Sequence, residues 1–165
     1  NLSSHKKGWD DRWEEFSNYA EEGQEIKDFL LAMVDEDTNS FNAIMSAFQL
    51  PKGTDEEKAI RQETVQDATK YAVEVPLKVM KTALKSMNMI KAMAEIGNPN
   101  SVTDAGVGAL CARTAGYGAY LNIKINLGGL KDKEYVDKTL EHAKALLQEA
   151  QNMEAEIMKI VENKI

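Results

Sequence analysis

Apolar residues return every three or four positions along the first part of the chain, which is the spacing of one face of a helix. Between residues 9 and 48 this pattern predicts one long helix, or two helices in line. It is carried by Trp13, Phe16, Ile26, Leu30, Met33, Phe41, Ile44 and Phe48. The pattern stops at Leu50-Pro51-Lys52-Gly53, because Pro51 disfavours helix at the residue before it and Gly53 permits a turn.

A second helix is predicted from Thr54 to about Ile96. Its start, Thr54-Asp55-Glu56-Glu57, has the form of a capping box, in which the Thr54 hydroxyl accepts from a free backbone N–H and Glu57 reaches back to the cap. Pro76 removes one backbone donor inside this helix. The helix should end at Gly97-Asn98-Pro99-Asn100, where a glycine cap is followed by a proline.

Two more helices are predicted in the second half. One starts at Ser101 or Thr103 and ends near Gly128, and the many Gly and Ala residues in its middle suggest that another helix or a ligand approaches it closely. The other starts near Asp132 and has the apolar spacing of a bundle helix, with Val136, Leu140, Ala143, Leu147, Ala150, Ile157 and Ile160. Four long helices joined by short turns predict a single all-α domain over residues 1–165, an up-and-down antiparallel helical bundle.

The composition fits a folded domain that binds neither nucleic acid nor membrane. The 165 residues carry a net charge of −7, and Lys and Arg are scattered rather than gathered into the basic stripe that phosphate binding needs. There is no apolar run of about 18 residues. The single Cys111 cannot form a disulfide within the chain, which favours a cytoplasmic location. His5 and His142 have no partners at metal-ligand spacing, so no metal site is predicted.

Asp37 is the residue most indicative of chemistry. On a helical wheel it falls at the centre of the apolar stripe of the first helix. One interpretation is a structural carboxyl that is bonded to a neighbouring helix or cap. The other is a carboxyl desolvated among apolar side chains, whose pKa rises towards neutrality as a general acid or base requires. Asp35 points away on the same wheel and is interpreted as solvated.

Three polar residues of the third predicted helix are further candidates. Asp104 lies in its first turn, where a carboxylate either caps the helix or serves a site. Asn122 and Asn126 are one turn apart and can face one target, as structural hydrogen bonders or as readers of a heterocycle. Asp104 and Asn122 are about 27 Å apart along one helix. They would need an antiparallel helix from a second subunit to share a pocket, which predicts a dimer.

A short basic cluster, His5-Lys6-Lys7, stands near the start of this acidic chain. Solvated surface charge is its usual explanation. The alternative is that Lys6 and Lys7 form a patch for a multiply anionic ligand tail. Both interpretations remain open from the residues alone.

Several segments together resemble the family of formiminotetrahydrofolate cyclodeaminases and methenyltetrahydrofolate cyclohydrolases, in order and at the family's spacing. They are residues 34–41 (VDEDTNSF), 50–58 (LPKGTDEEK), 75–77 (VPL), 97–104 (GNPNSVTD) and 118–127 (GAYLNIKINL). The similarity extends over nearly the whole chain. Members of that family usually begin with a helix preceded by a Pro-Gly-Gly-Gly-Ser segment, so the sequence is expected to lack that N-terminal helix and the Gly-rich segment.

The resemblance implies an enzyme of folate one-carbon metabolism that opens or closes the one-carbon bridge of tetrahydrofolate, as a cyclohydrolase or a cyclodeaminase. It implies a homodimer with the active site at or near the subunit interface, and a tetrahydrofolate derivative as substrate with no metal or redox cofactor. An aspartate of the Val-Asp-x-Asp segment is the acid/base residue there, a role that falls to Asp37 first and to Asp35 second.

By the same resemblance, Asp104, Asn122 and Asn126 are expected substrate contacts, and Lys6 and Lys7 would meet the glutamate tail of folate. The rival hypothesis, from another functional class, is a non-catalytic helical interaction module. It is suggested by the Gly- and Ala-rich third helix and the regular last helix.

Overall fold

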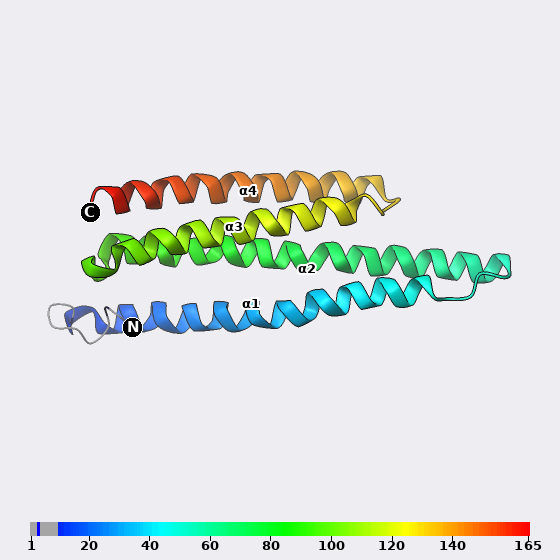
Figure 1. Ribbon diagram of the computed structural model, residues 1–165, viewed down its shortest axis with the longest axis horizontal. Helices are drawn as coiled ribbons and strands as arrows, with labels where there is room; N and C mark the ends of the chain where they lie inside the picture. The colour runs from blue at the N-terminus through cyan, green and yellow to red at the C-terminus, as the bar shows by residue number, and fades with distance from the viewer. Residues whose placement is uncertain (1–2, 4–9) are drawn as a thin grey trace.

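Four long helices run up and down beside one another in the computed structural model, which describes residue 3 and residues 10–165 (Figure 1). They are α1 (Trp13–Phe48), α2 (Asp55–Ile96), α3 (Val102–Leu127) and α4 (Lys133–Glu162). Short 3-10 turns, Asp10–Arg12 and Pro99–Ser101, precede α1 and α3. No strand occurs within these ranges, which confirms the predicted all-α antiparallel bundle. None of the described helices combines the length and apolarity that crossing a membrane requires.

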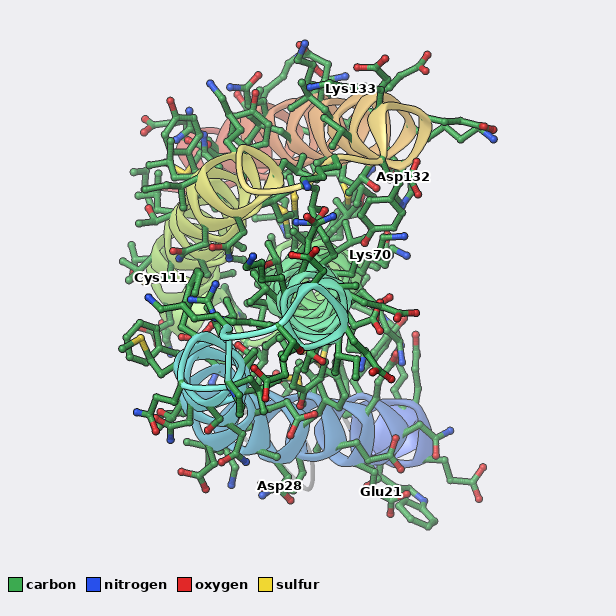
Figure 2. The ribbon with its side chains drawn as sticks, turned by 90° about the vertical axis from the view of Figure 1, so that its right-hand side faces the viewer. Glu21, Asp28, Lys70, Cys111, Asp132 and Lys133 are labelled. Carbon is green, nitrogen blue, oxygen red and sulfur yellow. The ribbon has the colours of Figure 1, made fainter. Side chains whose placement is uncertain are left out.

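The starts of α2 and α4 follow from local side-chain chemistry. Thr54 Oγ1 accepts from the Glu57 N–H at 3.1 Å while Glu57 Oε2 accepts from the Thr54 N–H at 3.0 Å, so the predicted capping box is present. Asp132 caps α4 by accepting from the Tyr135 N–H at 3.1 Å. That hydrogen bond, and then an ion pair of 3.0 Å with Lys70, lower the pKa of Asp132. Figure 2 shows Lys70 and Asp132 pointing toward one another from α2 and the start of α4.

Helix α2 is the central element, because it packs against each of the other three helices. Helices α2, α3 and α4 also pack mutually and enclose two apolar clusters, one along each half of the bundle. The largest fully buried side chains of these clusters are Met80, Met87, Ile123 and Ile157. The predicted inner face of α4 is confirmed at Ala143, Ala150 and Ile157. On α2, Ile60 lies exposed near the start of the helix.

Helix α1 has a different environment, because it rests on α2 and barely approaches α3 or α4. Phe16 and Ile26 are buried against α2, but Phe41 is 60% exposed and Phe48 is 49% exposed. The apolar stripe predicted for this helix is therefore covered at Phe16 and Ile26 and open at Trp13, Phe41 and Phe48. The physical reason is that a helix with one neighbour has one buried side, whereas the stripe is wider than that side.

An uncovered apolar face follows from this arrangement. Viewed along the bundle, α3 and the C-terminal part of α1 lie on the same side of α2 (Figure 2). Both carry exposed apolar side chains: Leu31, Val34, Phe41, Met45 and Phe48 on α1, and Val107, Leu110, Tyr117, Leu121 and Ile125 on α3. We call these residues the uncovered face.

Two glycines of α3 face neighbouring helices. A Cβ added at Gly106 would stand 3.4 Å from Val161 of α4, and one added at Gly108 would stand 3.6 Å from Ile90 of α2. Another helix therefore lies beside each of these two positions, at a distance that alanine would also allow. At Gly118 no described atom lies within 4 Å of the added Cβ, so this glycine opens onto the uncovered face.

We expect Thr54→Ala to lower the free energy of unfolding by about 1 kcal/mol, because it removes the cap of α2. Thr64→Ala is the matched control: Thr64 is an exposed residue inside the same helix, where its hydroxyl only donates to the Ile60 carbonyl. Alanine is the better helix former there, so the control should be neutral or slightly stabilising. Urea unfolding followed by circular dichroism measures both, and equal effects would contradict the capping role.

Candidate functional site

A groove of about 380 Å³ lies between α1 and α3, above α2. Its position follows from the fold, because α1 and α3 both rest on α2 and leave a space between them. The volume lies within the usual range for small-molecule sites, roughly 300–1,000 Å³. Residues of all three helices line it: Leu30, Met33, Val34, Asp37 and Thr38 of α1, Pro76 and Val79 of α2, and Ala119 and Asn122 of α3.

Asp37 is the sole charged residue among those that line the groove. Its carboxylate has no hydrogen bond or ion pair with any described residue, so it is available to a ligand. The side chain is solvent-exposed in this single chain. The interpretation of Asp37 as a desolvated carboxyl is therefore wrong for the isolated chain, because the apolar residues beside it belong to the uncovered face.

Asn122 lies across the groove from α1, on α3. Its Nδ2 donates to the Gly118 carbonyl of its own helix at 3.4 Å, a long and weak bond. The Oδ1 atom accepts no hydrogen bond from the described residues. The structure thus brings together the two predicted residues Asp37 and Asn122, which are far apart in sequence, as a carboxylate and an amide on opposite walls.

Apart from Thr38, whose hydroxyl donates to the Val34 carbonyl, the rest of the groove is apolar. Pro76 and Val79 of α2 form its floor, and Ala119 widens it on the α3 side because its side chain is small. Such a surface accommodates a flat heterocycle, while the carboxylate attracts a positive centre and the amide offers both a donor and an acceptor. The arrangement is suited to a planar ligand with a cationic, nitrogen-rich part.

The neighbours of Asp37 have other roles. Asp35 is exposed and does not line the groove, as the wheel predicted. Glu36 accepts a hydrogen bond from the Tyr71 hydroxyl of α2, and this bond raises the pKa of Tyr71. The bond ties α1 to α2 one residue before Asp37. Sequence reasoning missed Tyr71 and also Thr38, because neither stands out from its neighbours until the two helices are placed together.

Asp104 lies away from the groove. It lines a separate cavity of about 330 Å³, formed by the end of α2 and the start of α3 together with Ser3. Asp104 and Asn122 do not meet within the chain, in agreement with their spacing of about 27 Å along one helix. The structure therefore places Asp104 outside the groove of Asp37.

Asn126 has a structural partner. Its Nδ2 donates to the Ala72 carbonyl of α2 at 2.8 Å, and the side chain is half-buried. Although one turn from Asn122, it is not among the residues that line the groove. The two amides therefore have different surroundings, because Asn122 lines the groove and Asn126 is bonded to α2.

Two remaining expectations concern charge and metals. Lys6 and Lys7 lie outside the described residues. Across residue 3 and residues 10–165, no group of three or more His, Cys, Asp or Glu side chains is arranged to hold a metal ion. Cys111 is a free, exposed thiol on α3.

Comparison with known proteins adds to this geometry. Residues 1–145 match the formiminotransferase-cyclodeaminase family. The whole chain is 33% identical to a methenyltetrahydrofolate cyclohydrolase of Methylorubrum extorquens and covers 79% of that protein. It is 35% identical over 133 residues to the formimidoyltransferase-cyclodeaminase of Rattus norvegicus, covering 81% of this chain but 25% of the rat protein.

The fold has a counterpart among solved structures. A formiminotetrahydrofolate cyclodeaminase from Thermotoga maritima superposes with a TM-score of 0.85 at 23% identity, over 99% of this chain and 77% of the other. The protein is accordingly of the class of all-helical bundles that have the fold of this cyclodeaminase. The sequence matches go further than the fold: the chain belongs to the formiminotransferase-cyclodeaminase family.

Proposed function

We propose that this protein acts on the one-carbon bridge of tetrahydrofolate, as a methenyltetrahydrofolate cyclohydrolase or a formiminotetrahydrofolate cyclodeaminase, with Asp37 as the acid/base residue. The observation that carries the proposal is the pairing of Asp37 and Asn122 across one groove. Full-length similarity to a protein named as a methenyltetrahydrofolate cyclohydrolase supports the substrate class.

In the hydrolytic reaction the substrate carbon is an amidinium-like centre between two folate nitrogens. Water adds to this carbon while Asp37 accepts one of its protons, which gives a neutral adduct. The proton is then returned to one of the nitrogens, that C–N bond breaks, and the adduct hydroxyl loses its proton as the formyl group forms. Asp37 acts as base and then as acid, a role for which a free carboxylate facing the substrate is suited.

In the deaminating reaction the carbon is bonded to one folate nitrogen and to an iminium nitrogen. The second folate N–H adds to the carbon, and its proton passes through Asp37 to the departing nitrogen, which leaves as ammonia. The product is the same bridged cation that the hydrolytic reaction consumes. Both reactions pass through a tetrahedral adduct at the same bridge carbon, and their steps require neither a metal nor a redox cofactor.

The other residues have supporting roles in this proposal. Asn122 orients the heterocycle or the bridge through its free amide oxygen, and the apolar floor excludes bulk water from the groove, apart from the molecule that adds to the carbon in the hydrolytic reaction. Asp35 does not transfer the proton. Lys6 and Lys7 meet the glutamate tail of the substrate, and Asp104 is a contact at a distance from the reacting carbon.

We expect Asp37→Asn to slow the enzymatic loss of methenyltetrahydrofolate absorbance by about 100-fold or more, because it removes the proton acceptor and keeps the side-chain shape. Asp35→Asn is the matched control, with the same change two residues away and outside the groove. It should retain nearly full activity. The assay is run where spontaneous hydrolysis is slow, and circular dichroism verifies that both variants fold.

A folded Asp37→Asn protein with the wild-type rate would remove Asp37 from the mechanism. Ammonia release from formiminotetrahydrofolate, measured in parallel, assigns the chain to one of the two activities. A folded wild-type protein that neither turns over nor binds either folate would favour the interaction module instead.

We further propose that a second copy of the chain covers the uncovered face and so completes the active site. The exposed apolar residues of α3 share one side of that helix. They are arranged nearly symmetrically about Gly116, with Val107 and Ile125 equally far from it on either side. An antiparallel twofold contact between two α3 helices requires this self-complementarity. Such a contact lies beside Asn122 and would desolvate the groove.

We expect the wild-type chain to be a dimer by light scattering and Ile125→Asp to be a monomer with reduced turnover, because a charge would be buried at the contact. Ile165→Asp is the matched control, since Ile165 is 74% exposed at the chain end and Ile125 is 76% exposed on α3. The control should remain dimeric. A monomeric wild-type protein with full activity would refute the interface site.

A further inference from the structure

Pro76 leaves one buried carbonyl of α2 without its helical partner. In an α-helix each carbonyl accepts from the N–H four residues later, so the Ala72 carbonyl would accept from residue 76. Proline has no backbone N–H. Ala72 and Pro76 are both buried, so water does not readily replace the missing donor. A buried carbonyl without a partner is destabilising.

Asn126 of α3 supplies the missing donor. Its Nδ2 lies 2.8 Å from the Ala72 oxygen, and the two residues are far apart in the sequence. The side chain thereby links α3 to one specific carbonyl of α2. Apolar contacts between helices tolerate small shifts along the helix axis, but a hydrogen bond to a single acceptor fixes the register.

The bond lies next to the groove. Pro76, which creates the free carbonyl, is part of the groove floor, and Asn122, which forms one wall, is one turn before Asn126 on α3. A shift of α3 along α2 would move Asn122 relative to Asp37. The hydrogen bond thus holds Asn122 at a defined position along the groove.

We propose that Asn126 is a positioning residue that acts together with Pro76, by replacing the absent N–H and setting the register of α3 on α2 so that Asn122 faces Asp37. This inference rests on the proposed function for its kinetic readout. It gives Asn126 a different role from the direct substrate contact that the family resemblance implies. The two roles are separable by experiment.

The test is a double-mutant cycle with Asn126→Leu and Pro76→Ala. Alanine at position 76 restores the backbone N–H, so the Ala72 carbonyl regains its helical donor, and removal of Asn126 no longer leaves an unpaired buried carbonyl that would draw in water and shift α3 out of register. We expect Asn126→Leu to reduce kcat/KM for methenyltetrahydrofolate by about tenfold or more in the Pro76 background, because it displaces a group beside the substrate. With Pro76→Ala as the reference, the same substitution should change kcat/KM by less than about threefold.

Gln66→Leu is the matched control. Gln66 also bridges α2 to the end of α3, donating to the Gly129 carbonyl at 2.9 Å and accepting from the Lys131 N–H at 2.7 Å. Neither the Gly129 carbonyl nor the Lys131 N–H is a helical partner of residue 76, so these two bonds do not depend on the proline. Its substitution should therefore have the same effect in both backgrounds.

Equal loss of kcat/KM on Asn126→Leu in both backgrounds would overturn the proposal and indicate a direct substrate contact. A loss of thermal stability with unchanged kcat and KM would reduce Asn126 to a structural role and also overturn it. If Asn126→Leu alone does not fold, the double variant should fold, and its failure to do so counts against the pairing with Pro76.

Urea unfolding of the wild type, the two single variants and the double variant separates this inference from the proposed function. The coupling between positions 76 and 126 is expected in the unfolding midpoints whether or not the protein acts on folate. Wild-type activity without such coupling would refute the inference alone, whereas coupling without activity would refute the proposed function alone.

Discussion

The packing of α1, α3 and α4 around α2 is the constraint on which the rest of the structure depends. Helices α2, α3 and α4 enclose the apolar clusters, whereas α1 has one neighbour. Because α1 and α3 both rest on α2 without packing on each other, a groove forms between them. The same arrangement leaves apolar residues of both helices without cover. The site and the uncovered face are therefore two results of one packing pattern.

The helices could be predicted from the sequence because their ends depend on short-range chemistry. The Thr54 and Glu57 capping box and the Asp132 cap satisfy backbone groups within three residues, so sequence alone contains the necessary information. The inner face of α4 was predictable for a similar reason, because its apolar period is regular. Burial of the α1 stripe was not, since it depends on how many neighbours that helix has.

The site was predictable in part. Asp37 stands out in the sequence by its place in an apolar stripe, and Asn122 as one of two amides that are one turn apart. That the two share one groove, and that Asp104 does not, depends on the relative placement of three helices. The role of Asn126 was hidden for the same reason: its partner is a backbone carbonyl, which has no signature in the sequence except the proline four residues later.

The absence of close packing between α1 and α3 has a consequence for how such a site evolves. The width of the groove depends on how α1 and α3 each pack on α2, and on the α1 side the Tyr71–Glu36 hydrogen bond and the Lys85–Glu22 ion pair join the two helices. Substitutions at these contacts would change the separation of Asp37 and Asn122 without altering either side chain. A bundle of this kind can adjust the spacing between the two walls of a groove while the residues on those walls stay the same.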